Sequence, residues 1–91
     1  MNITEITVTL RNEDKLKAFV NVTFDDQFVV RGLKVIKSAN GFFISMPSRK
    51  MPDGTFRDIA HPITKEFREF IEKAILKKYN ETLEQEKSNQ D

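Results

Sequence analysis

The segment Ser45–Pro62 reads SMPSRKMPDGTFRDIAHP, and it places a tight turn between clustered basic residues. Within Pro52–Gly54, proline fixes φ, aspartate can bond back to the backbone, and glycine accepts the left-handed conformation. This turn predicts a hairpin whose two arms fold back on each other. Arg49 and Lys50 on the first arm then lie near Arg57 on the second, so three cations are displayed on a short, stiff loop. Such a cluster suits an anionic polymer.

The sequence before this hairpin alternates between apolar and polar residues, which is typical of half-buried β-strands. Strands are predicted over residues 2–11, 16–24, 27–37 and 42–46. Because the connections between them are short, consecutive strands should pair as antiparallel neighbours in a four-stranded meander. The apolar pattern of the third strand shifts by one residue at Gly32, which predicts a β-bulge there.

After the hairpin, apolar residues recur at spacings of three and four, which predicts one amphipathic C-terminal helix over residues 65–80 or slightly beyond. Thr64 is the predicted N-cap of this helix. The predicted fold class is therefore α+β, with a four-stranded antiparallel β-sheet, a basic β-hairpin arm and one helix covering one face of the sheet. Residues 1–80 are expected to form a single domain, and the acidic tail over residues 81–91 is expected to be disordered.

The second face of the predicted sheet carries large apolar groups that one helix cannot cover, which implies a partner. These residues, predicted as an interaction face, are Phe19, Val29, Ile36 and Phe43. Two uses of the face are open at this stage. Another copy of the chain can pack there to form a homodimer, or the aromatic rings can form a platform on which nucleic-acid bases stack.

A chain of 91 residues without cysteine has room for one small domain held by a modest core, which self-association would support. No apolar run approaches the roughly 18 residues of a membrane span. The N-terminal residues also lack the basic start and apolar centre of a signal peptide. We therefore expect a cytoplasmic protein that does not bind membranes.

The net charge of +1 hides a local basic patch. Residues 31–57 carry six cations against the single carboxylate of Asp53, a net charge of +5. These six residues, the candidates for contact with nucleic acid, are Arg31, Lys34, Lys37, Arg49, Lys50 and Arg57. The basic residues of the predicted helix could widen this track, or they could form a solvated face paired with the helix glutamates.

The sequence argues against an enzyme. His61 is the only histidine and there is no cysteine, so the usual nucleophile–base pairs and zinc sites cannot be assembled. The three glycines are isolated from one another, which excludes a phosphate-cradling glycine loop. We expect no cofactor, no metal site and no small-molecule substrate, and a turn role for His61.

The run M-P-S-R-K-x-P-D-G-x-F-R-D-I-A-H-P-I, from Met46 to Ile63, resembles the signature of the stage V sporulation protein G family. The likeness includes residues 24–30 and 40–44, and it covers roughly residues 1 to 80. The resemblance implies a small sheet-plus-helix fold that dimerises and binds DNA and RNA, in bacterial regulators of sporulation, septation and virulence genes. Arg49, Lys50 and Arg57 fall inside the shared signature, whereas Lys34 and Lys37 lie outside its firmest part.

Two functions from different classes follow from these observations. The first is a homodimeric regulator that binds DNA and RNA through phosphate contacts from the basic arm. The second is a protein–protein interaction module in cell division or septation, in which the cations only keep the protein in solution. The strength of nucleic-acid binding and its dependence on salt separate the two.

Overall fold

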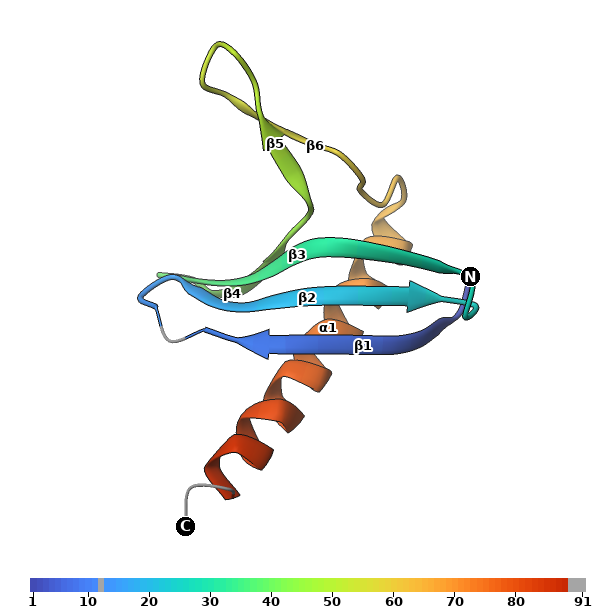
Figure 1. Ribbon diagram of the computed structural model, residues 1–91, viewed down its shortest axis with the longest axis vertical. Helices are drawn as coiled ribbons and strands as arrows, with labels where there is room; N and C mark the ends of the chain where they lie inside the picture. Colours follow the sequence, from blue (N-terminus) through green and yellow to red (C-terminus); the bar gives the residue numbers. More distant parts are fainter. Residues whose placement is uncertain (12, 89–91) are drawn as a thin grey trace.

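The computed structural model describes residues 1–11 and 13–88. Its main layer is a β-sheet of four antiparallel strands in the order β1-β2-β3-β4, with one helix, α1, against one face (Figure 1). This arrangement confirms the predicted α+β fold class. The elements in chain order are β1 (Ile3–Leu10), β2 (Leu16–Phe24), β3 (Phe28–Ser38), β4 (Gly41–Ser45), β5 (Ser48–Lys50), β6 (Phe56–Asp58) and α1 (Lys65–Ser88).

The core lies between the inner face of the sheet, defined as the face that α1 covers, and the apolar stripe of that helix. Every second residue of β2, from Ala18 to Phe24, is buried, as period-two alternation requires. Ile71, Ile75 and Tyr79 meet these strand residues from the helix side. Thr64 caps the helix as predicted, because its Oγ1 accepts a hydrogen bond from the backbone N–H of Phe67 at 3.1 Å.

The predicted bulge in β3 is confirmed by the strand register. Val20 pairs with Leu33 but Val22 pairs with Val30, so β3 contains one extra residue opposite β2. Gly32 occupies this position with a φ of +87°. A Cβ placed there would make only an ordinary contact with Cβ of Pro47 at 3.6 Å, so backbone conformation rather than crowding favours glycine.

A tight turn at Asp25 and Asp26 joins β2 to β3, in the short connection between the predicted strands 16–24 and 27–37. Both residues have positive φ, 52° and 54°, and the Gln27 N–H donates to the Phe24 carbonyl at 2.9 Å, which closes a β-turn across them. The N-terminus is tied to this turn in both directions. The Asn2 N–H donates to Oδ1 of Asp25 at 3.0 Å, and the Asp25 N–H donates to the carbonyl of Asn2 at 2.8 Å.

The helix is longer than the sequence predicted. Residues 81–88, expected to belong to a disordered tail, continue α1 as far as Ser88, and residues 89–91 lie outside the described part of the chain. The physical reason is Leu83, which lies one turn beyond the buried Tyr79 and still packs against the core. Lys87 in the last turn also complements the negative end of the helix dipole.

Candidate nucleic-acid interface

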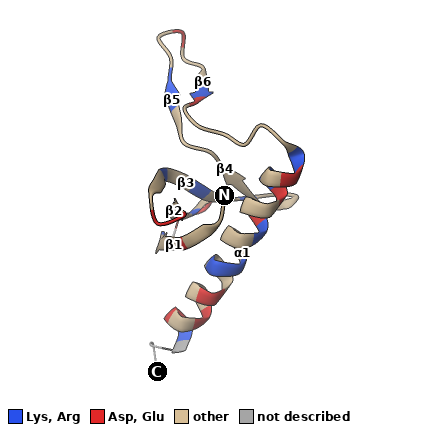
Figure 2. Cartoon of the chain, turned by 90° about the vertical axis from the view of Figure 1, so that its right-hand side faces the viewer, with Lys and Arg blue, Asp and Glu red and all other residues tan. Residues whose placement is uncertain are grey.

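Strands β5 and β6 form a separate two-stranded hairpin that projects away from the four-stranded sheet (Figures 1 and 2). We call residues 47–59 the arm. Its base is closed by the Ile59 N–H, which donates to the Pro47 carbonyl at 2.7 Å. At its tip, the Gly54 N–H donates to the Met51 carbonyl at 3.0 Å and the Met51 N–H donates to the Thr55 carbonyl at 2.7 Å. Gly54 has a φ of +91°, so the tip is a three-residue loop with a glycine bulge.

Asp53 holds the tip of the arm together. Its Oδ1 accepts hydrogen bonds from the Thr55 hydroxyl at 2.6 Å and from the Thr55 N–H at 3.0 Å. These bonds, the hydroxyl bond above all, favour the ionised carboxylate and lower the pKa of Asp53 below its ordinary value of 3.8. Because the pKa of Asp53 is lower in the folded protein, the stability that its ionised carboxylate gives to the tip is complete at pH values above the ordinary pKa. It is lost as the pH falls through the lowered one.

This account predicts the effect of removing the Thr55 hydroxyl. In Thr55→Val the backbone hydrogen bond remains but the hydroxyl bond is lost, so the pKa of Asp53 should rise part of the way back toward 3.8. A ¹³C NMR titration of the Asp53 carboxyl in both proteins measures this. An unchanged midpoint would show that the hydroxyl does not interact with the carboxylate in solution.

The register of the arm places Arg49 directly opposite Arg57. Directly paired residues project from the same face with Cα atoms about 5 Å apart. Two like charges so placed repel each other in the free protein. Within the described residues the one ion pair joins Arg11 to Glu13, so neither arm arginine is neutralised by a carboxylate there. An oxyanion held between the two guanidinium groups would replace this repulsion with two charge-assisted contacts.

Lys50 lies on the other face of the arm. It pairs with Phe56, and Ser48 pairs with Asp58 on the same face. The three cations expected to cluster are therefore an arginine pair on one face and a lysine behind it, next to an exposed aromatic ring. All three side chains are exposed to solvent.

The other predicted basic residues divide between the two faces of the four-stranded sheet. Lys34 pairs with Phe19 across the strands and so lies on the outer face, which we define as the face opposite α1. Arg31, beside the bulge, is exposed, and its neighbour Gly32 adjoins Pro47 at the base of the arm. Lys37 pairs with Phe42, whose ring contacts Tyr79 of the helix, so Lys37 lies toward the helix side.

Sequence reasoning did not single out Arg11, which the structure also brings to the outer face. Its guanidinium lies 5.4 Å from the centroid of the Phe19 ring. Its Nε lies 3.4 Å from a carboxylate oxygen of Glu13. Only the pairing of Thr9 with Phe19 brings Arg11 to that ring, and a single sequence does not give this register.

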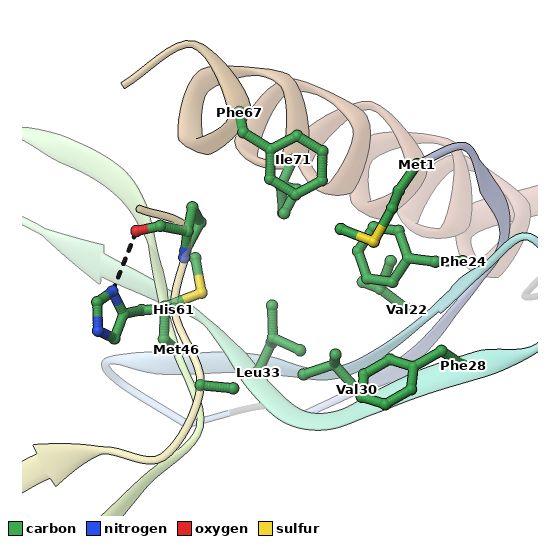
Figure 3. A pocket seen from close by; sticks show the side chains of 12 residues that line it. Met1, Val22, Phe24, Phe28, Val30, Leu33, Met46, His61, Phe67 and Ile71 are labelled. Carbon is green, nitrogen blue, oxygen red and sulfur yellow. Dashed lines mark hydrogen bonds between the residues drawn. The ribbon is translucent and has the colours of Figure 1, made fainter. Parts of the chain in front are cut away.

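An apolar pocket of about 140 Å³ lies between the inner face of the sheet, the start of α1 and the segment that follows the arm (Figure 3). Its lining is almost wholly apolar, and His61 is its one titratable side chain. The Nδ1–H of His61 donates to the carbonyl of Pro62 at 3.0 Å, which gives the imidazole a turn-stabilising contact. Among the residues that the structure describes, no three histidine, aspartate or glutamate side chains come together as metal ligands would.

No helix within residues 1–11 and 13–88 is both long and apolar enough to cross a membrane.

The fold and the arm define a small sheet-plus-helix protein with a protruding basic hairpin. The sequence profile of the SpoVG family matches residues 1–81. A protein of Clostridium perfringens named "Putative septation protein SpoVG" is 59% identical over 80 residues, 87% of this chain and 89% of the relative. Proteins of the same name from Thermoanaerobacter sp. and Acetivibrio thermocellus are 51% and 59% identical. The first alignment covers 100% of both chains, and the second covers 87% of this chain and 85% of the relative.

The chain belongs to the SpoVG family, as the resemblance in the arm region indicated. The names of these relatives refer to septation, and they name no catalytic activity.

Proposed function

We propose that this protein binds DNA and RNA, mainly through phosphate contacts from the arm, and thereby controls genes of sporulation, septation or virulence. The observation that supports this most directly is the cross-strand pair of Arg49 and Arg57 on an exposed, hydrogen-bonded hairpin. Guanidinium groups match the geometry of phosphate oxygens and can bind them in a bidentate manner. Lys50, and Arg31 near the base of the arm, supply further phosphate contacts.

The arm is suited to this role because it holds its arginines away from the body of the protein. The turn at Pro52–Gly54 fixes the two strands in register, so little conformational freedom is lost when a phosphate binds. Backbone contacts of this kind position a protein on nucleic acid without reading its sequence. We therefore expect a moderate sequence preference.

A homodimer would present two arms, and the second arm would then bind at a high effective concentration. Exposed apolar side chains of the arm support association between copies. Phe56 and Ile59 are 68% and 66% exposed, which is costly for a monomer in water. Burying them against a second copy would remove that cost.

The function is tested by a salt titration of the unmodified protein. Fluorescence anisotropy with a labelled duplex should show saturable binding at about 50 mM salt that weakens steeply toward about 200 mM. With roughly six phosphate contacts per dimer, the slope of log K against log salt should be about −5. Absence of saturation at the lowest salt, or a slope near zero, would instead favour a protein–protein interaction module.

A further inference from the structure

The outer face of the sheet is left open by the helix, and Figure 1 looks directly onto it, with α1 behind the strands. Strand pairing brings Thr9, Phe19, Lys34 and Ser45 into one row across this face. Ile36 and Phe43 form a cross-strand pair in the next row. The side chain of Phe43 is 45% exposed, which is a large aromatic surface in contact with water.

Cations surround these aromatic rings. Arg11, Lys17, Arg31 and Lys34 lie on or beside the outer face, against the carboxylates of Glu5 and Glu13, which gives a net charge of +2. The remaining paired positions on the face are the exposed apolar Val29, as predicted, and the polar residues Thr7, Asn21 and Thr23, which can donate and accept hydrogen bonds. The Arg11 guanidinium lies over the Phe19 ring, 5.4 Å from its centroid, which is within the range of a cation–π contact.

This charge distribution argues against a second copy of the chain as the partner of the face. In a twofold dimer built on it, the same surface would meet itself, so one face with a net charge of +2 would lie against another with a net charge of +2. Like charges brought together in an interface oppose association. An anionic partner with planar apolar groups would satisfy both the cations and the rings.

We infer that the outer face binds single-stranded nucleic acid, with a base stacked on Phe43 and the backbone held by Lys34 and Arg31. This inference rests on the proposed function and extends it from phosphate contact to base contact. The base of the arm adjoins β3 next to Arg31, because Cβ of Pro47 lies 3.6 Å from the Cβ position of Gly32. A single strand of nucleic acid can therefore run from the arm, past Arg31, onto the sheet. Bases within a duplex are stacked on each other and are not available to Phe43, so the face distinguishes single strands from duplexes.

The test compares Phe43→Ala with Phe70→Ala. Phe70 is 48% exposed on the helix, so the two substitutions remove the same ring from sites of similar exposure. Anisotropy titrations use single-stranded RNA and DNA of about 12 nucleotides and a duplex of the same sequence. Phe43→Ala should weaken single-strand binding about 10-fold or more and leave duplex binding within about twofold. Phe70→Ala should change neither affinity. Comparison of the single-stranded RNA and DNA titrations shows which polymer the face prefers.

A second variant keeps the inference testable if Phe43→Ala folds poorly. The chain has no tryptophan, so Phe43→Trp introduces a single reporter that should retain single-strand affinity and lose fluorescence when a base stacks on it. Phe70→Trp should not be quenched.

Three outcomes would overturn the inference. If Phe43→Ala keeps its single-strand affinity and Phe43→Trp shows no quenching, the outer face is not the binding surface. The proposed binding by the arm would still stand. A change in molecular mass on sedimentation of Phe43→Ala shows that the face joins copies of the chain. Unmodified protein that binds neither polymer removes the proposed function itself.

Discussion

Replacing Arg49 and Arg57 together by alanine should reduce affinity for duplex DNA about 100-fold or more at low salt, since each arm loses two charge-assisted contacts. The salt slope should also become shallower by about one for each phosphate contact removed. The fold should be retained, because both side chains are exposed and pair with no carboxylate in the described part of the chain. The substitution also removes the repulsion between the paired arginines. The melting temperature should therefore be unchanged or slightly higher.

The matched control is Lys73→Ala combined with Lys77→Ala. Both lysines are exposed on α1, and their removal changes the net charge of the protein by the same amount as removal of the arginine pair. Affinity should fall by only a small factor in this variant. Equal losses in the two variants would mean that overall charge, rather than the arm, governs binding.

Ile75→Ala should have the largest effect on stability. Ile75 is fully buried at the centre of the helix–sheet core, with 0% of its surface exposed. Its truncation removes apolar burial and leaves a cavity, which together cost about 3 kcal/mol. A domain of this size has a total stability of roughly 5–14 kcal/mol, so the loss is a large fraction of it. The melting temperature should fall by roughly 15 °C in a calorimetric scan.

Ile63→Ala is the control for this prediction, because it makes the same chemical change at a side chain that is 90% exposed. Its effect on the free energy of unfolding should stay within about 0.5 kcal/mol. If Ile75→Ala were as mild as Ile63→Ala, the packing of α1 on the sheet described above would be wrong.

Much of the fold could be predicted because it depends on local patterns. The alternation in residues 16–24 gives the bounds of β2, and the phase shift at Gly32 gives the bulge. Thr64 gives the start of the helix. The end of the helix was missed because the acidic composition after Asn80 suggested a solvated tail. One apolar residue, Leu83, is enough to keep that segment against the core.

The candidate site was predictable only in part, because its geometry depends on strand register. The sequence indicates that Arg49, Lys50 and Arg57 share a hairpin, but which of them share a face depends on the hydrogen bonds of the tip. A shift of one residue would place Lys50 rather than Arg49 beside Arg57. The contact between Arg11 and Phe19 likewise depends on the register of β1 against β2, which local sequence patterns do not determine.

The most direct test of the central claim, that the arm holds nucleic acid through paired arginines, is an NMR titration at low salt that follows the arginine Nε–Hε signals. A short oligonucleotide should shift and broaden the signals of Arg49 and Arg57 first, in proportion to the bound fraction, while the signal of Arg68 on α1 stays in place. Signals from Arg49 and Arg57 that remain unmoved at saturating oligonucleotide would contradict the account.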